Sequence, residues 1–206
     1  MSDDFLLILD LVGIAVFAMT GALVGVRKEL DGFGVTMLAV ITGLGGGVLR
    51  DVLIGSVPPA ALDDWRYLVV PAVTGVVVFF FHPAVGRVEK QIAILDAIGL
   101  GLFCVTGAVK AEDFGLSIVP AGLLGMVSAV GGGMMRDVLA GRVPVIFKEG
   151  LYATPALAGA LIAATLHHYD VQQGWYAVAV GTAIIWRILA VKRGWQAPLP
   201  PGIDRG

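Results

Sequence analysis

The sequence has very little charge for its length. Only 15% of its 206 residues are Asp, Glu, Lys or Arg, whereas 57% are apolar and the mean hydropathy is +0.88. Soluble domains carry about 25% charged residues. A soluble domain of this size could not cover its surface with so few polar groups, so the composition predicts an integral membrane protein.

Basic clusters and cysteines are also scarce. The net charge is -2, and no basic stripe is present that could neutralise phosphates, which excludes nucleic acid as a partner. The single cysteine, Cys104, lies in an apolar run and excludes a disulfide framework or a cysteine metal cluster. Residues Met1 to Asp4 lack the basic start of a cleavable signal peptide, so we expect the first apolar run to stay in the mature protein.

Enzyme motifs are missing as well. There is no nucleophile elbow and no metal-binding helix pattern, and Gly131 to Asp137 lacks the Lys-Ser/Thr ending of a phosphate-binding loop. We therefore expect no enzymatic activity, no catalytic residue, no protein substrate, and no metal site beyond a transient monovalent cation.

Seven apolar runs approach the roughly 20 residues that a membrane-spanning helix needs. They are Phe5 to Val26, Phe33 to Gly55, Trp65 to Phe81, Ile92 to Val109, Leu116 to Ala140, Leu151 to Leu166 and Val171 to Ala190. Only short polar breaks separate them. The expected fold is an all-α membrane protein with seven transmembrane helices in one bundle.

Lysine and arginine are divided unevenly between the two sets of helix ends. Basic loops are retained on the cytoplasmic side, and nine basic residues lie at one set of ends whereas two, Arg66 and Lys110, lie at the other. The nine are Arg27, Lys28, Arg87, Lys90, Arg142, Lys148, Lys192, Arg193 and Arg205. This split predicts a protein of the cell (inner) membrane with its N-terminus outside and its C-terminus in the cytoplasm.

The sequence repeats itself with an offset of 86 residues. Positions 9 to 58 match positions 95 to 144 at 19 of 50 places without gaps, and the matches include Asp, Arg and three consecutive glycines. Each copy has three crossings, and this odd number predicts that the second copy is inverted in the membrane. We expect a first three-helix repeat at 1–86, a second, inverted repeat at 87–168, and a seventh helix with a cytoplasmic tail at 169–206.

Each repeat carries one Gly-Gly-Gly-x-x-Arg-Asp motif, in the second and fifth runs. Three glycines in a helix interior cost roughly 1 kcal/mol each relative to alanine, which favours a kink or break at Gly45 to Gly47 and at Gly131 to Gly133. Backbone groups freed in a membrane need a cavity or protein partners. Close helix packing is the competing explanation for these glycines.

The motif arginines, Arg50 and Arg136, place charge inside the bilayer, where ionised groups usually face a partner or water. Adjacent helix positions diverge by about 100°, so we expect Arg50 to pair with a carboxylate on another run rather than with Asp51. Asp10 and Asp96 match across the repeat and are the candidate partners. The ion pairs either fix helix packing or set the electrostatics of a permeation path.

The doubled motif within seven inverted-repeat spans resembles the trimeric intracellular cation channel (TRIC) family in its prokaryotic branch, in which related sequences are also labelled glycine transporters. The resemblance covers about Phe5 to Arg193. It implies a homotrimer in the lipid bilayer, with one potassium-conducting pore per protomer around glycine-rich kinks of the second and fifth helices. The implied path or pore-bracing residues are Gly45, Gly46, Gly47, Arg50, Asp51, Gly131, Gly132, Gly133, Arg136 and Asp137.

The resemblance implies no cofactor, only permeant potassium or sodium, with a bound lipid as a further candidate ligand. Gly43 and Ala129 stand where animal members often have lysine, which argues against an inositol phospholipid there. Two alternatives remain open: a secondary transporter of a small zwitterion such as glycine, because such sites use broken helices in inverted repeats, and a structural membrane subunit without transport.

Overall fold

The computed structural model describes residues 3–82, 88–148 and 151–197, and seven helices of 16 residues or more make up most of them. They are α1 (Asp3–Arg27), α2 (Gly32–Leu53), α4 (Trp65–Phe81), α5 (Val88–Asp113), α6 (Ile118–Leu139), α8 (Ala153–His168) and α9 (Tyr176–Arg193). Each coincides with one of the seven apolar runs, with ends that differ by a few residues. The chain is therefore an all-α membrane protein.

Five of these elements are long and apolar enough to cross a membrane: α1, α2, α5, α6, and α9 together with the short 3₁₀ helix η2 (Gln173–Trp175) that precedes it. The helices α4 and α8, with 17 and 16 residues, are shorter. A helix of this length reaches about 25 Å at 1.5 Å per residue. That α4 and α8 also cross stays a prediction.

Two further short helices were not predicted from the sequence. They are α3 (Ala60–Asp63), which follows Pro58 and Pro59, and α7 (Val145–Lys148), which follows Pro144. Proline is favoured before and at the first position of a helix, where its missing N–H costs nothing. One such helix therefore stands after the Arg-Asp motif in each repeat.

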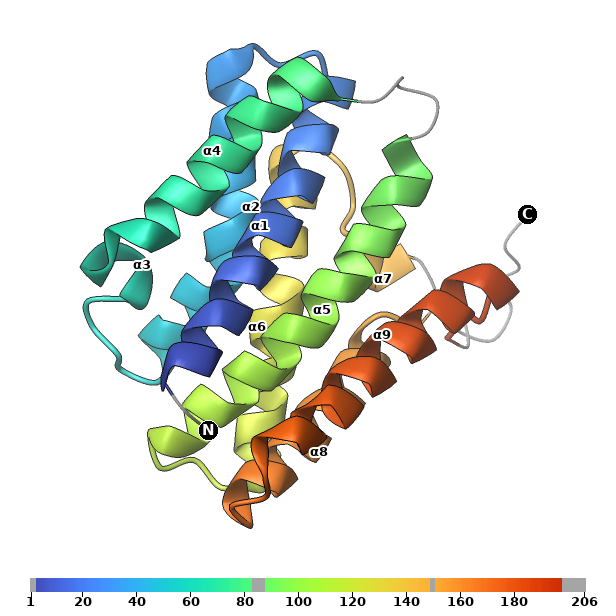
Figure 1. The fold of residues 1–206 in the computed structure, drawn as a ribbon. Helices are drawn as coiled ribbons and strands as arrows, with labels where there is room; N and C mark the ends of the chain where they lie inside the picture. Colours follow the sequence, from blue (N-terminus) through green and yellow to red (C-terminus); the bar gives the residue numbers. More distant parts are fainter. Residues whose placement is uncertain (1–2, 83–87, 149–150, 198–206) are drawn as a thin grey trace.

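The helices α1 and α5 lie side by side in the middle of the bundle and run in opposite directions (Figure 1). The helix α6 packs against α5 and α2, α4 packs against α1 and α2, and α8 and α9 cover the other side of α5. Phe17 of α1 stacks on Phe103 of α5 with ring centroids 5.5 Å apart. These two rings are equivalent in the 86-residue register, so the repeats meet through matching residues.

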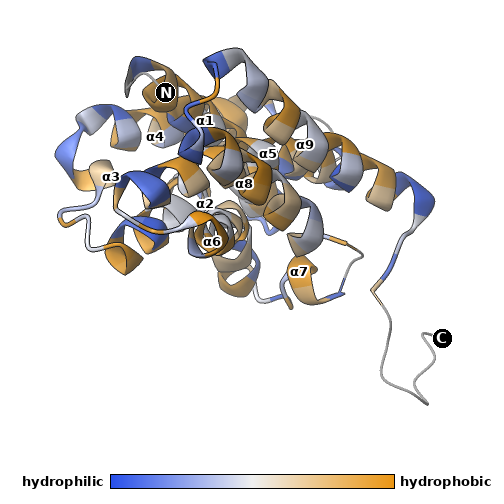
Figure 2. Ribbon diagram, turned by 90° about the horizontal axis from the view of Figure 1, so that it is seen from below, coloured by the Kyte–Doolittle hydropathy of each residue, from blue (hydrophilic) through white to orange (hydrophobic). Residues whose placement is uncertain are grey.

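The outer sides of the helices are apolar, with hydrophilic residues gathered toward the helix ends (Figure 2). Val119, Phe80 and Ile185 are more than half exposed in the isolated chain. Exposed apolar surface of this extent would be unfavourable in water. It suits contact with lipid.

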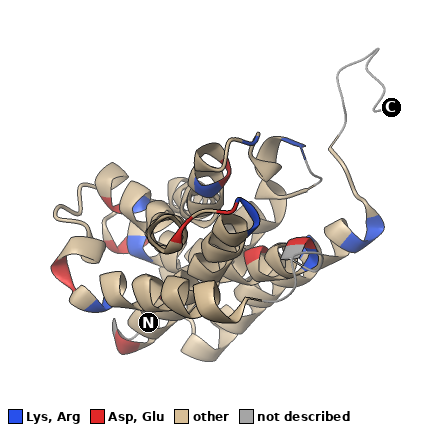
Figure 3. Ribbon diagram, turned by 90° about the horizontal axis from the view of Figure 1, so that it is seen from above, with Lys and Arg blue, Asp and Glu red and all other residues tan. Residues whose placement is uncertain are grey.

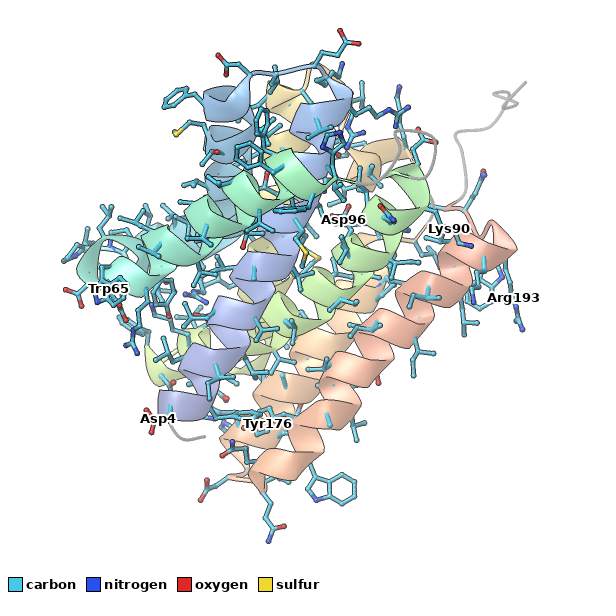
Figure 4. The ribbon with its side chains drawn as sticks, turned by 45° about the horizontal axis from the view of Figure 1, so that its top comes forward. Asp4, Trp65, Lys90, Asp96, Tyr176 and Arg193 are labelled. Carbon is cyan, nitrogen blue, oxygen red and sulfur yellow. The ribbon has the colours of Figure 1, made fainter. Side chains whose placement is uncertain are left out.

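Charged residues are few, and most of the ribbon carries none (Figure 3). Lys90 and Arg193 lie at one end, and Asp4 and Tyr176 lie at the opposite end (Figure 4). Of the nine basic residues used to predict orientation, Arg87 and Arg205 lie outside the described residues, as do the predicted boundary at 86 and 87 and the tail from 198 onward.

The helix α4 begins with a local cap, in which Asp64 is the N-cap residue. Asp64 accepts hydrogen bonds from the backbone N–H and the side chain of Arg66, at 2.9 Å and 2.8 Å. These bonds from Arg66 hold the pKa of the Asp64 carboxyl below its ordinary value. The cap fixes where α4 enters the apolar region.

Candidate functional site

The helices α2 and α6 cross at their glycine triplets, backbone against backbone. A Cβ atom added to Gly46 would overlap the carbonyl oxygen of Ser128, and one added to Gly132 would overlap the carbonyl oxygen of Thr42. Thr42 and Ser128 are themselves equivalent in the repeat register. The contact therefore has the same form from both sides, and its centre admits only glycine.

Both helices continue through their triplets, α2 from Gly32 to Leu53 and α6 from Ile118 to Leu139. The prediction that the glycines break these helices is wrong. The intrinsic cost of glycine, about 1 kcal/mol per residue, is offset because the missing side chains let the two backbones approach closely. A bend of either helix without a break stays a prediction.

The outer glycines of the triplets have different surroundings. A Cβ on Gly45 would lie 2.5 Å from the sulfur of Met135, a flexible side chain that can move. A Cβ on Gly47 would meet nothing nearer than Arg50 Nη2, at 3.8 Å, an ordinary contact. A Cβ on Gly131 would face Gly46, and a Cβ on Gly133 would face the hydroxyl of Tyr152.

One cluster of buried charges lies beside this crossing in the second repeat, and we call Thr20, Asp96, Arg136, Asp137 and Arg142 the second-repeat cluster. Arg136 donates Nη1 and Nη2 to the two carboxylate oxygens of Asp96, at 2.6 Å and 3.0 Å. Its Nη1 also donates to Thr20 Oγ1 at 2.7 Å, and its Nε donates to Asp137 at 3.0 Å. Arg142 adds two bonds to Asp137 Oδ1, at 2.9 Å and 2.6 Å. Arg136 is thus held on all sides.

The equivalent first-repeat cluster consists of Asp10, Arg50, Asp51, Tyr67 and Lys110. Arg50 Nε donates to Asp51 Oδ1 at 2.8 Å, and Lys110 Nζ donates to the same oxygen at 2.8 Å. The nearest approach of Arg50 to Asp10 is 3.7 Å, an ion pair beyond hydrogen-bond reach. Tyr67 donates its hydroxyl to Asp10 Oδ2 at 3.3 Å. Asp10 is therefore held loosely.

The expectation that Arg50 avoids its neighbour Asp51 is wrong, and Arg136 likewise pairs with Asp137. The 100° between adjacent helix positions separates the Cβ atoms, but the long arginine side chain curls back far enough to cover it. Asp10 and Asp96, the candidate partners on other helices, lie within ion-pair distance of Arg50 and Arg136 respectively. Each motif arginine thus faces two carboxylates.

Each motif aspartate also binds the start of the short helix that follows it. Asp51 Oδ2 accepts from the backbone N–H of Ala60 in α3, and Asp137 Oδ2 accepts from that of Val145 in α7, both at 3.0 Å. Helix N-termini attract negative charge. The proline after each motif was the available sequence signal for these helices. Lys110 and Arg142 had been assigned to opposite rims, and nothing in the sequence linked them to the motif.

Arg187 of α9 is a third buried arginine, 3% exposed, and it has no counterpart in the repeats. Its guanidinium lies 4.6 Å from the ring centre of Tyr152, and its Nη1 donates to the carbonyl of Leu151 at 3.3 Å. Together with Asp96, Glu89 and Arg142 it lines a pocket of about 180 Å³ at the Lys90 end of the bundle. This pocket gives access to the second-repeat cluster.

Comparison with known proteins places the chain in a family. The family model described as "Glycine transporter" matches residues 7–83 and 93–168, one segment in each predicted repeat. A UPF0126 membrane protein of Streptomyces coelicolor is 48% identical over 198 residues, which cover 95% of this chain and 91% of that protein. The UPF0126 inner membrane protein YadS of Escherichia coli K12 is 34% identical, with 93% of each chain covered.

Among solved structures, the TRIC trimeric intracellular cation channel orthologue from Rhodobacter sphaeroides superposes with a TM-score of 0.88 at 35% identity. The match covers 92% of this chain and 98% of that one. The overall fold agrees with these comparisons. This chain belongs to the prokaryotic branch of the trimeric intracellular cation channel family, whose family model bears the description "Glycine transporter".

Proposed function

We propose that this protein is a homotrimeric channel for monovalent cations, chiefly potassium, with one pore in each protomer. The observation that carries the proposal is the pair of buried, charge-balanced clusters on either side of the α2–α6 crossing, in a chain whose solved relatives are cation channels. In each cluster two carboxylates offset the motif arginine, so positive charge does not dominate the interior. Buried ionisable groups at this depth are typical of ion pathways.

The proposed path runs past the crossing rather than through it, because Gly46 and Gly132 contact the opposing backbone and leave no room between α2 and α6. In this proposal the chain forms seven spans in two inverted repeats, with the first-repeat cluster nearer the outside and the second-repeat cluster nearer the cytoplasm. The protein lies in the inner membrane with its C-terminus in the cytoplasm. The candidate residues of both triplets brace the path, and neither cofactor nor metal is required.

Recordings from purified protein in a planar bilayer with asymmetric KCl test this proposal. We expect resolved single-channel steps that reverse near the potassium equilibrium potential, and a cross-linked trimer on denaturing gels. A reversal potential near that of chloride, or bilayers that stay silent at every voltage, would overturn it. Protein heated before reconstitution is the control for leaks.

A second candidate function is secondary transport of a zwitterion such as glycine. The pocket of about 180 Å³ combines two carboxylates, Glu89 and Asp96, with two guanidiniums, Arg142 and Arg187. This charge pattern complements an ammonium and a carboxylate in one small molecule. Saturable uptake of labelled glycine into liposomes, together with silent bilayers, would establish transport instead of conduction.

A further inference from the structure

The carboxylates of Asp10 and Asp96 are equivalent in sequence but not in bonding. Both oxygens of Asp96 accept hydrogen bonds from Arg136. Asp10 accepts only from Tyr67, through Oδ2, and no described protein group donates to its buried Oδ1. The Asp10 side chain is 10% exposed. A buried carboxylate oxygen without a donor is costly, so this atom calls for a ligand.

A small cavity lies beside Asp10. It measures about 10 Å³, and its lining includes Asp10, Arg50, Asp51, Tyr67 and Phe103. This is room for roughly one water molecule, and a potassium ion has nearly the same radius as water. Carboxylate and hydroxyl oxygens are ligands that such hard cations prefer.

The surrounding charge permits a cation there. The formal charges of Asp10, Arg50, Asp51 and Lys110 sum to zero. Arg50 donates Nε to Asp51 at 2.8 Å, its Nη2 lies 3.7 Å from Asp10 Oδ2, and its Nη1 has no acceptor among the described groups. Lys110 is 24% exposed, so its ammonium is partly hydrated. Asp10 Oδ1 is thus the one carboxylate oxygen of the first-repeat cluster that accepts no hydrogen bond from a described group.

Resting on the proposed channel function, we propose that Asp10 Oδ1 and the adjoining cavity form a binding site for one partly dehydrated monovalent cation of potassium size. The second-repeat cluster offers no such site. Asp96 is fully used by Arg136, and Arg187 adds a further positive charge to the pocket beside it. The two clusters therefore have different roles: the first-repeat cluster binds the cation, and the second-repeat cluster fixes the helices.

Thermal unfolding of the purified protein in KCl and in choline chloride at equal ionic strength tests this site without conduction. Ligands that bind only the folded state raise its melting temperature in a saturable way. We expect potassium to raise the melting temperature of the wild type, and Asp10→Asn to weaken the apparent affinity at least about tenfold, the effect of losing one charged ligand. Asp63→Asn, which removes an exposed carboxylate near the same end, should keep the full increment.

The site is overturned if potassium raises the melting temperature of Asp10→Asn as much as that of the wild type, or if potassium does not raise the melting temperature of the wild type. Crystals of the wild type soaked in thallium provide a second measurement that needs no variant, with anomalous density expected at the Asp10 carboxylate and its absence counting against the site. A protein that conducts without an Asp10-dependent increment loses this inference alone. A silent protein that shows the increment loses only the proposed channel function.

Discussion

Arg50 and Arg136 begin from the same seven-residue motif, yet they end in different surroundings. Arg136 binds both oxygens of Asp96 and the hydroxyl of Thr20, whereas Arg50 approaches Asp10 no closer than 3.7 Å. Thr106, the second-repeat equivalent of Thr20, makes no side-chain hydrogen bond to Arg50 or to any other described group. Identical motifs therefore do not make identical sites, because the groups around the motif decide how tightly it is held.

The residues that neutralise the motif aspartates differ in origin as well. Arg142 belongs to the same repeat as its partner Asp137 and follows it by five residues. Lys110 comes from α5 of the second repeat and reaches 59 positions back to Asp51 of the first. The Arg142–Asp137 contact is local, whereas the Lys110–Asp51 contact joins the two repeats. Separation of the repeats would break the Lys110–Asp51 contact in the first-repeat cluster and the Arg136–Thr20 contact in the second.

The largest expected difference is between Asp96→Asn and Asp10→Asn. Loss of the Asp96 charge removes the two-bond ion pair of the fully buried Arg136, which costs about 3 kcal/mol of unfolding free energy although Asp137 stays in place. Asp10→Asn costs about 1 kcal/mol or less, because Arg50 approaches Asp10 only to 3.7 Å and makes no hydrogen bond to it. Denaturant titration of the purified variants measures both. Equal losses in the two variants would show that the clusters are equally tight.

A smaller effect should be the same in both repeats. Gly46→Ala and Gly132→Ala each place a methyl group against a backbone carbonyl that cannot rotate away, and each should cost roughly 2 kcal/mol. Gly47→Ala is the matched control, since its methyl group meets ordinary contacts and alanine favours the helix. We expect Gly47→Ala to match or exceed the wild-type melting temperature. A harmless Gly46→Ala would mean that the crossing is not close.

The smallest expected difference separates the two threonines. Thr20→Val removes an acceptor of a charged donor and should cost about 1.5 kcal/mol. Thr106→Val removes a buried hydroxyl that has no partner, so stability should stay within about 0.5 kcal/mol of the wild type or rise. Melting temperatures of the two variants, which have the same shape change, test this directly. The reverse order would show that Thr106 supports Arg50.

The sequence allowed much of the fold to be predicted because hydropathy and length locate helices in a membrane. The matched pair Asp10 and Asp96 was visible for a similar reason, since the repeat register marks equivalent positions. Lys110 could not be found in this way. Its contact with Asp51 depends on how α5 lies against α2, which no local pattern reports.

The mistaken helix break has an instructive cause. Helix propensity describes each helix by itself, whereas the group that Gly46 contacts is the backbone of Ser128 on another helix. Propensity is a weak guide when two helices share a close contact. Arg187 shows the same limit, since its partner Tyr152 lies just before α8, which the repeat pattern did not connect with α9.

The bare crossing of α2 and α6 has a mechanical consequence. Helices that interlock through side chains resist rotation, because ridges must leave their grooves. At Gly46 and Gly132 there are no side chains to interlock, so the distance between the two axes is fixed by backbone contact while the angle between them is not. The α2–α6 crossing therefore holds the two repeats together at one contact and leaves them free to rotate about it.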